Sequence, residues 1–481
     1  MSQDQIKIDS VGASAVREGS RVVVIGGGPG GYEAALVARQ LGAHVTLVER
    51  SGIGGSAVLT DVVPSKTLIA TAEWMTITEN ADELGILTGS QTFPVDLQRV
   101  HTRILTLAQR QSDDIRGRLE GEGVEIVDGT GRIGPNTDGV RTVLVDETAG
   151  GSRELHAEIV LLSVGTHPRT LPDAAPDGER ILAWNQVYNL TELPEHLIVV
   201  GSGVTGAEFA GAYNVLGSEV TLVSSRDQVL PGEDSEAAQL IESVFRRRGM
   251  NILSASRAQS ARRTDDGVVV TLTDGREIEG SHCLIAVGSI PNTAGIGLAE
   301  GGVTLKESGH IQVDRVSRTT AYRVYAAGDC TGVLPLASVA AMQGRIAMYH
   351  ALGDAVSPLD IRSVSANIFT SPEIATIGVT EQDILDGSVD GAVTRLPIAR
   401  NPRAKMLGIR EGFIKLFSDR GSGVIIGGVV VAPNAGELIF PITLAVSHRL
   451  TVDQVAQAFT IYPSLTGSLT EAARQLHTER R

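Results

Sequence analysis

The clearest hydrophobic pattern in the chain is a uniformly apolar run at residues 22–25, which leads directly into a glycine-rich turn at residues 26–31. An apolar run without alternation is typical of a strand that is buried on both faces of a parallel sheet. Residues 32–41 then carry alanine and leucine on one side, which predicts a helix. A second predicted strand, residues 44–48, ends at Glu49. The pattern predicts a strand, a glycine turn, a helix and a second strand that ends in an acid.

The same pattern recurs in the middle of the chain. An apolar run at residues 197–200 precedes a glycine turn at residues 201–206, and a predicted helix at 207–216 leads to a predicted strand at 219–223. Two such units predict two dinucleotide-binding domains in one chain. Each unit is later followed by an apolar strand that runs into a glycine turn before proline, in residues 159–169 and 283–293. We interpret these two segments as the strands on which the chain crosses between the domains.

The character of the chain changes from about residue 363. Apolar and polar residues alternate at residues 412–417, and residues 424–431 form another apolar run. Residues 434–449 follow as a predicted helix. We therefore expect an α/β protein whose two Rossmann-like domains are followed by a separate C-terminal α+β domain.

Length and charge narrow the classes of protein that fit this organisation. The 481 residues are enough for about three domains of ~150 residues each. A formal net charge of -15 repels phosphate groups and argues against nucleic acid as a partner. The first 20 residues are polar and lack a signal-peptide core, and Pro433, Glu437 and Pro441 interrupt the longest apolar region, residues 424–446. We expect a cytoplasmic protein without a membrane span.

The first glycine turn has the spacing of a dinucleotide-binding motif. It lies between a predicted strand and a predicted helix, and Glu49 follows at the distance that the motif requires. The glycines let backbone amides approach a pyrophosphate, and the start of the helix adds a positive dipole end. Glu49 would accept hydrogen bonds from the ribose hydroxyls. The predicted loop residues are Gly26, Gly28, Pro29, Gly30 and Gly31.

The second glycine turn lacks the acid that closes the first unit. Its loop residues are Gly201, Gly203, Val204 and Gly206. The position of the acid is occupied by Ser224, with Ser225 and Arg226 after it. A carboxylate would favour NADH, whereas two hydroxyls and a guanidinium can accept a 2′-phosphate. These residues favour NADPH with NADH tolerated; the alternative is that Arg226 is only a solvated loop charge.

Taken together, the motifs resemble those of the flavoprotein disulfide reductases, the family of the lipoamide dehydrogenases. The resemblance covers nearly the whole chain after the N-terminal tail. It includes both glycine loops and the residues that follow them in this family, namely Gly54-Gly55, Pro64-Ser65-Lys66, Glu208, Gly328-Asp329 and the segments 369–374 and 433–438.

The resemblance implies FAD at the first site, NADPH or NADH at the second, and a homodimer formed through the C-terminal domain. The implied domains are a polar tail (residues 1–19), an FAD-binding domain in two pieces (20–168 and 295–362), an NAD(P)-binding domain (169–294) and a dimerisation domain (363–481). Asp329 would hold the FAD ribitol, and Lys66 would pair with Glu208 beside the flavin and stabilise negative charge there. The remaining implied cofactor-binding residues are Gly55, Ser56, Gly131, Val164, Gly165, Thr166, Gly288, Leu336 and Ala337.

Two departures from the family pattern concern the dithiol chemistry. The two redox cysteines of the family are replaced by Ala57 and Val62, so no thiolate can attack a disulfide there. The catalytic histidine and its orienting glutamate are replaced by Tyr462 and Gly467. A tyrosine is a poor base at neutral pH but a good hydrogen-bond donor. The chain has only two cysteines, Cys283 and Cys330, which lie in or after apolar runs without redox spacing, so we expect both to be buried.

The coordinated loss of thiols and base indicates a changed electron acceptor. The chain is similar to the cysteine-lacking NAD(P)H quinone reductases of this family, which implies a two-step exchange through FAD with Tyr462 of the partner subunit available to a quinone oxygen. Two enzymatic alternatives need only flavin and the second site: a soluble pyridine nucleotide transhydrogenase and an NAD(P)H oxidase. A non-catalytic, flavin-stabilised structural or partner-binding protein is a third alternative. No histidine has metal-ligand spacing, so we expect no metal site.

Overall fold

The computed structural model describes residues 19–79, 81–86 and 93–479. The predicted tail, residues 1–19, lies outside this range except for Gly19. The chain divides into two compact units, each built from three segments. The first comprises Met1–Val58, Arg110–Thr166 and Pro291–Leu359, and the second comprises Leu59–Gln109, His167–Ile290 and Asp360–Arg481.

The first unit is built on a seven-stranded sheet in the order β17-β6-β1-β2-β3-β4-β5. The strands are β1 (Arg21–Ile25), β2 (His44–Glu49), β3 (Glu125–Thr137), β4 (Val140–Glu147), β5 (Ser152–Ala157), β6 (Ile159–Leu162) and β17 (Val324–Ala326). The strands from β17 to β3 pair in parallel, and β3, β4 and β5 form an antiparallel meander. The apolar run after Arg21 is buried throughout, as a strand covered on both faces must be.

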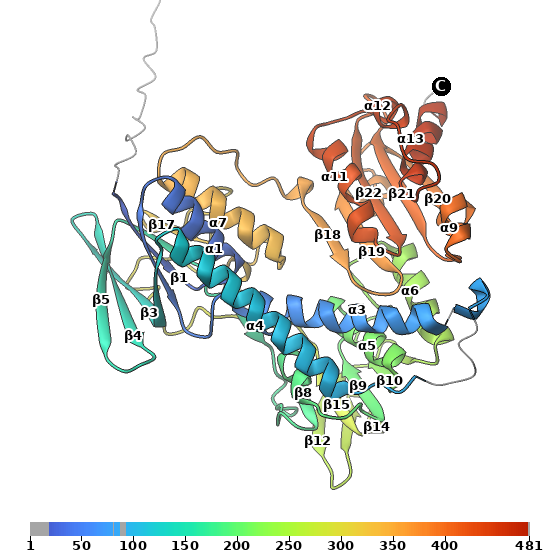
Figure 1. The fold of residues 1–481 in the computed structure, drawn as a ribbon, viewed down its shortest axis with the longest axis horizontal. Coiled ribbons are helices and arrows are strands. Elements are labelled where there is room, and N and C mark those ends of the chain that lie inside the picture. Colours follow the sequence, from blue (N-terminus) through green and yellow to red (C-terminus); the bar gives the residue numbers. More distant parts are fainter. Residues whose placement is uncertain (1–18, 80, 87–92, 480–481) are drawn as a thin grey trace, which may run out of the picture. The chain divides into compact units, whose positions relative to one another are not determined.

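Two helices cover one face of this sheet, α1 (Pro29–Gln40) and α7 (Ala337–Ala351), which lie side by side in Figure 1. They approach so closely that a Cβ on Gly344 would lie 2.1 Å from the carbonyl oxygen of Gly30. Alternate residues of β1 point to this helical face and to the opposite face, which the meander covers. The parallel register brings the carboxyl-terminal ends of β1, β2, β6 and β17 to the same side of the sheet. The first glycine loop, Glu49 and Asp329 lie at or just after these strand ends.

The second unit contains a parallel sheet in the order β11-β10-β9-β15-β8. The strands are β8 (Ile181–Ala183), β9 (His196–Val200), β10 (Glu219–Val223), β11 (Asn251–Leu253) and β15 (His282–Ile285). Its helices are α3 (Val62–Glu79), which packs on α5 (Val204–Leu216), and α6 (Ser235–Arg247). A small antiparallel sheet joins β12 (Ala258–Arg263), β13 (Val268–Leu272) and β14 (Glu277–Gly280). The long helix α4 (Leu97–Gly121) contains the boundary between the units.

The C-terminal part of the second unit is α+β, as the alternation of its sequence predicts. Its antiparallel sheet has the order β18-β19-β22-β21-β20. The strands are β18 (Ser365–Ile368), β19 (Glu373–Gly378), β20 (Gly391–Pro397), β21 (Phe413–Asp419) and β22 (Ile425–Ala432). The helices are α8 (Glu381–Leu385), α9 (Pro402–Met406), α10 (Ala435–Leu438), α11 (Phe440–Ser447), α12 (Val452–Ala456) and α13 (Gly467–Glu479).

Three details differ from the elements that the pattern predicts. The predicted helix at 434–449 is interrupted at Ile439, because Pro441 has no N–H and its ring clashes with the preceding turn. The helices after both glycine loops begin earlier than predicted, at Pro29 and Val204. At Pro29 the reason is that proline is well suited to a first helical position. The hydropathy pattern did not reveal α3, α4 or the two antiparallel meanders. Across the ranges that the structure describes, no helix combines the length and the apolar character needed to span a membrane.

Candidate functional site

The first glycine loop joins β1 to α1 and is shaped by close backbone approaches. Gly26 has a φ of 101°, and a Cβ there would lie 2.2 Å from the carbonyl oxygen of Ser163. A Cβ on Gly31 would lie 1.8 Å from the Gly26 oxygen, whereas no described heavy atom lies within 4 Å of a Cβ on Gly28. The loop is therefore closed toward the sheet and open at the start of α1. An open backbone at a helix N-terminus fits the pyrophosphate of a dinucleotide.

Glu49 holds this loop from the end of β2. The side chain is 7% exposed, and its carboxylate accepts hydrogen bonds from the backbone N–H groups of Gly27 and Ser51, each at 2.6 Å. The carboxylate is thus fixed beside the open backbone of Gly28. Its remaining lone pairs fit the predicted contact with a ribose.

Asp329 follows β17 at the same edge of the sheet. Burial raises the pKa of this carboxyl above its usual range, and the Thr166 hydroxyl donates a weak hydrogen bond to it at 3.4 Å. The loop before Asp329 is held by Gln343 of α7, whose side-chain oxygen accepts the N–H of Gly328 at 2.9 Å. Sequence analysis missed Gln343, since a glutamine inside a helix carries no motif. A desolvated carboxyl with one long hydrogen bond suits the hydroxyls of a ribitol chain, so these residues fit FAD.

The other predicted FAD residues of the first unit surround the same loops. Gly55 begins α2 (Gly55–Leu59) with a φ of 59°, and a Cβ there would lie 2.9 Å from the Gly28 Cα. Ser56 is the next residue. Gly131 of β3 packs on Ile25 at the end of β1. Three more follow β6 and two begin α7: Val164, Gly165, Thr166, Leu336 and Ala337.

The second glycine loop repeats the geometry of the first. Gly201 has a φ of 112°, and a Cβ there would lie 2.2 Å from the carbonyl oxygen of Ala286. A Cβ on Gly206 would lie 1.8 Å from the Gly201 oxygen, and a Cβ on Gly203 would have no described heavy atom within 4 Å. Val204 is partly exposed at the start of α5, and Gly288 has a φ of 94° with open space around its Cα. The geometry fits a second dinucleotide.

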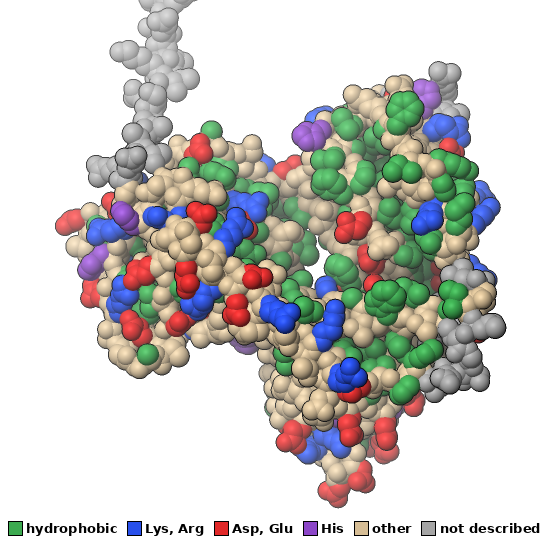
Figure 2. All heavy atoms as spheres, in the orientation of Figure 1, with side chains coloured by type: hydrophobic (Ala, Val, Ile, Leu, Met, Phe, Trp, Pro, Cys, Tyr) green, Lys and Arg blue, Asp and Glu red, His purple; other side chains and the backbone are tan. Residues whose placement is uncertain are grey.

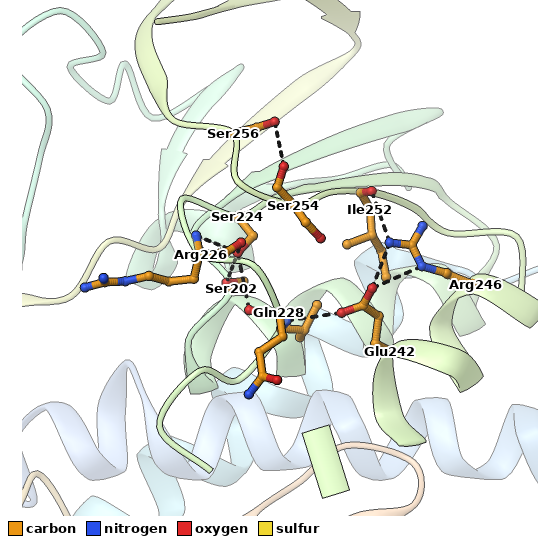
Figure 3. A network of polar contacts seen from close by, with 10 residues as sticks. Ser202, Ser224, Arg226, Gln228, Glu242, Arg246, Ile252, Ser254 and Ser256 are labelled. Carbon is orange, nitrogen blue, oxygen red and sulfur yellow. Dashed lines mark hydrogen bonds and ion pairs between the residues drawn. The ribbon is translucent and has the colours of Figure 1, made fainter. Parts of the chain in front are cut away.

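Ser224 is buried after the end of β10. Its side chain is 0% exposed, and its hydroxyl lies 2.7 Å from that of Ser202 and accepts the N–H of Arg226 at 3.1 Å (Figure 3). The hydroxyl is thus committed inside the loop and holds the backbone of Arg226, and the predicted contact of Ser224 with a nucleotide stays a prediction. Ser225 and Arg226 are exposed, and Figure 3 shows the Arg226 side chain extending away from the hydroxyl cluster.

Sequence analysis missed Ser202. The internal repeat contains the signal that could have found it, because Ser202 occupies the place of Gly27 and Ser224 the place of Glu49. A hydroxyl pair therefore replaces the contact between the Gly27 N–H and the Glu49 carboxylate.

The predicted pair of Lys66 and Glu208 forms within the second unit. The Lys66 Nζ donates to Glu208 Oε2 at 2.6 Å, and the side chains are 26% and 4% exposed. The second carboxylate oxygen accepts the N–H of Phe369 at 2.9 Å, and Lys66 lies 5.0 Å from the centre of the Phe369 ring. The pair thus joins α3, α5 and the segment after β18, and it places a cation at the helix that follows the second glycine loop.

The thiol positions contain no redox group. Ala57 lies in α2 and Val62 begins α3. Cys283 and Cys330 are both fully buried, as we predicted, and burial raises the pKa of each thiol to about 12. Neither thiol ionises at neutral pH.

The C-terminal position of the family base is open to solvent. Tyr462 is 83% exposed, and it borders a cavity of about 350 Å³ whose walls include Arg400, Thr460 and Glu471. Gly467, which stands in place of the orienting acid, begins α13. The ranges covered by the structure contain no cluster of three or more histidine, cysteine or acidic side chains that could hold a metal ion.

Comparisons with known proteins agree with this geometry. Residues 20–344 match the family described as pyridine nucleotide-disulphide oxidoreductase, and residues 364–473 match its dimerisation domain. The chain is 52% identical over 462 residues to an NAD(P)H dehydrogenase (quinone) of Mycobacterium tuberculosis, which covers 95% of this chain and 94% of that protein. It is 32% identical over 456 residues to a dihydrolipoyl dehydrogenase of Zymomonas mobilis, which covers 94% and 96%.

A solved structure is similar over nearly the whole fold. The crystal structure of LpdA from Mycobacterium tuberculosis matches with a TM-score of 0.92 at 52% identity and covers 95% of this chain and 99% of that one. The matches confirm the predicted fold class, with two dinucleotide-binding domains and a dimerisation domain, and the use of FAD and NAD(P)H by an oxidoreductase. The chain belongs to the pyridine nucleotide-disulphide oxidoreductase family.

Proposed function

We propose that this chain is an FAD-dependent NAD(P)H:quinone oxidoreductase that does not act on disulfides. One observation carries the proposal: both glycine loops keep the geometry of a dinucleotide site, while neither thiol of the chain ionises near neutral pH. Ala57 and Val62 replace the family's redox pair, and Cys283 and Cys330 are buried in apolar cores. The 52% identity to a relative named NAD(P)H dehydrogenase (quinone) supports a quinone as the acceptor.

The residues of the chain would position FAD, NAD(P)H and the positive charge of Lys66. FAD, when bound, supplies a centre that accepts hydride from a nicotinamide and returns two electrons to an acceptor. The loop around Gly28, with Glu49 and Asp329, would hold FAD, and the loop around Gly203 would hold NAD(P)H. Lys66, kept in place by Glu208, would stabilise negative charge beside the flavin. The apolar Ala57 and Val62 would make a dry wall where the family has its disulfide.

Arg226 supports NADPH as the preferred nucleotide. Its side chain is exposed beyond the end of β10, and the acid that would repel a 2′-phosphate is absent. Ser224 would act indirectly, since its hydroxyl holds the Arg226 backbone. Ser225 is exposed beside it and could add a second hydrogen bond.

A homodimer is the proposed working form. The match to a dimerisation domain at residues 364–473 supports it. The C-terminal region also exposes hydrophobic side chains to solvent, as Figure 2 shows in green; they include Phe440, Phe459, Ile461 and Tyr462. In such a dimer, Tyr462 of the partner subunit would donate a hydrogen bond to a quinone oxygen. Light scattering should give twice the mass of the chain.

The expected cytoplasmic location remains a prediction.

The central test is anaerobic reduction of the purified protein by NADPH, followed by reoxidation with separate acceptors. Quinones should reoxidise the protein rapidly, and lipoamide and glutathione disulfide should not. Initial rates against NADPH at several menadione concentrations should give parallel lines; intersecting lines would contradict the two-step exchange. Efficient turnover of either disulfide would overturn the proposal.

The same experiment separates the alternatives. Rapid oxygen uptake without quinone would indicate an NAD(P)H oxidase. Hydride exchange between NADPH and a thio-NAD analogue, without quinone turnover, would indicate a transhydrogenase. A bound flavin that NADPH does not bleach would indicate a protein without redox turnover.

A further inference from the structure

A small, partly open cavity lies in the second unit, between α3, α5 and the segment after β18. Its volume of about 20 Å³ is enough for one water molecule. The residues that line it are three or four positions apart on each helix, so they come from one face of α3 and one face of α5. They are Ile69, Ala72, Glu73 and Thr76 from α3, and Glu208, Gly211, Ala212 and Val215 from α5. The small side chains at the crossing leave the space open, since protein interiors otherwise pack without voids of this size.

Polar groups meet at this cavity. The carboxyl groups of Glu73 and Glu208 belong to residues of its wall, as do Thr370, Ser371 and Arg248. The Arg248 guanidinium donates to the backbone oxygen and the hydroxyl of Ser371, each at 3.4 Å. An apolar void stays dry, but a void with two or more polar partners holds an ordered water. This cavity therefore suits one ordered water, and Glu73 and Glu208 both belong to its lining.

The cavity bridges a gap along α3. Lys66 and Glu73 are seven residues apart, which is two helical turns or about 10 Å along the axis. Proton transfer needs hydrogen-bond contact, so the two side chains need intermediates. Glu208 is the first, at 2.6 Å from the Lys66 Nζ. A water in the cavity would connect Glu208 to Glu73.

Glu73 is suited to hold a proton. Burial raises the pKa of its carboxyl, and the negative charge of Glu373 on β19 raises it further. The other charged groups around the cavity are Glu208, which Lys66 neutralises, and Arg248, which is engaged with Ser371. Glu73 is half-buried, so it also keeps access to solvent.

The proposed reaction needs a proton from solvent. Its balance is NAD(P)H + H⁺ + quinone → NAD(P)⁺ + quinol, in which the hydride supplies two electrons and one hydrogen. One quinol O–H bond must therefore form with a proton that the nucleotide does not supply. The thiols and the histidine base of the family's dithiol chemistry are absent from this chain.

We propose that Glu73, the water in this cavity, Glu208 and Lys66 form a relay that carries this proton. A Lys66 N–H bond breaks as the O–H bond forms, and the resulting amine recovers a proton through Glu208. Glu208 takes it from the water, the water takes it from Glu73, and Glu73 takes it from solvent. The relay rests on the proposed function and on Lys66 lying beside the bound flavin.

The test compares acceptors that do and do not take up protons. Glu73→Gln should lower turnover with menadione by about 10-fold or more, in the range for loss of a proton-transfer group. Turnover with ferricyanide, which takes electrons alone, and the rate of flavin reduction by NADPH should remain within about twofold. Glu73→Asp should restore part of the menadione rate. Glu279→Gln, on the exposed surface of the same unit, is the matched control.

A second measurement does not depend on turnover. Infrared spectra of the full-length protein should contain the carbonyl band of a protonated carboxyl that titrates above the ordinary glutamate pKa and is absent from Glu73→Gln. Ala212→Val, which narrows the cavity but keeps both carboxyl groups, should lower the menadione rate and increase the solvent isotope effect.

Two results would overturn the relay: an unchanged menadione rate in Glu73→Gln, or equal losses with menadione and ferricyanide, which would show a merely structural role. A wild-type protein that reduces no quinone would instead overturn the proposed function.

Discussion

Replacing Lys66 with methionine tests how much the ion pair of Lys66 and Glu208 contributes to the free energy of unfolding. The substitution keeps most of the length and apolar character of the side chain but removes the ammonium group. Of the hydrogen bonds that the protein donates to Glu208, only the one from the N–H of Phe369 at 2.9 Å then remains. The Glu208 side chain is 4% exposed, so bulk solvent cannot surround the remaining charge without opening the packing of α3 on α5, and a single water in the adjacent cavity carries no charge to neutralise it.

The size of the effect follows from this burial. Removing one partner of a buried ion pair costs about 3–5 kcal/mol, because the other charge remains desolvated. Lys66 itself is 26% exposed, so the lower end applies. We expect a loss of about 3 kcal/mol in the free energy of unfolding, which is roughly a 150-fold change in the equilibrium constant. The double variant Lys66→Met with Glu208→Gln should recover most of the loss, because no unpaired charge remains.

The two tryptophans of the chain, Trp74 and Trp184, both lie in the second unit, so guanidinium unfolding followed by tryptophan fluorescence reports on this unit. Lys405→Met, on the exposed surface of α9, should change the free energy of unfolding by less than about 0.5 kcal/mol. A loss below about 1 kcal/mol in Lys66→Met, or a double variant no more stable than the single one, would refute the reasoning.

Three further predictions follow from other contacts. Arg226→Ala should lower kcat/KM for NADPH by about 10-fold and leave NADH within twofold, since a charge-assisted hydrogen bond contributes about 1.5 kcal/mol or more; equal losses with both nucleotides would contradict a 2′-phosphate contact. Asp329→Asn should weaken FAD binding about 10-fold or more, measured by flavin fluorescence. Because burial raises the pKa of Asp329, the cofactor-free protein loses stability as pH rises through that raised pKa, so the amide variant should unfold at a higher temperature at neutral pH and not at acidic pH. Lys415 is 3% exposed and lies among Asp234, Glu236 and Glu381. Replacing it with methionine should lower the free energy of unfolding by about 3–5 kcal/mol, and adding Asp234→Asn should recover part of the loss. A single variant as stable as the wild type would show that the carboxylates are solvated.

The parts of the site that sequence predicted are those with local signatures. A strand, a glycine turn and a helix form from consecutive residues, so the spacing of Gly26, Gly28 and Gly31 was sufficient to place the first loop. The pairing of Lys66 with Glu208 spans 142 positions and came only from resemblance to a family. No pattern of hydrophobic residues in α3 would have revealed it, because this helix is apolar on several sides.

Other features depend on tertiary contacts or on a periodicity that we overlooked. Leu97, Ile104 and Ala108 of α4 are buried at helical spacing, and this signal was available in the sequence. The burial of Ser224 was not, because a serine at the end of a strand can face either solvent or the loop. Its direction is decided by Ser202 from the preceding loop, whose hydroxyl lies 2.7 Å away.

The two halves of the internal repeat show how the acceptor could change without loss of the nucleotide sites. In the first loop a carboxylate, Glu49, accepts the backbone N–H of Gly27; at the equivalent place in the second loop the hydroxyls of Ser202 and Ser224 contact each other. Both loops are closed by contacts between glycines and neighbouring carbonyl groups, and no thiol takes part in either. Replacing the cysteines by Ala57 and Val62 therefore removes the dithiol chemistry and leaves the geometry of both glycine loops intact. The family's thiols and histidine base are absent from this chain, and in the proposed relay Glu73, the cavity water, Glu208 and Lys66 would supply the proton that quinone reduction needs.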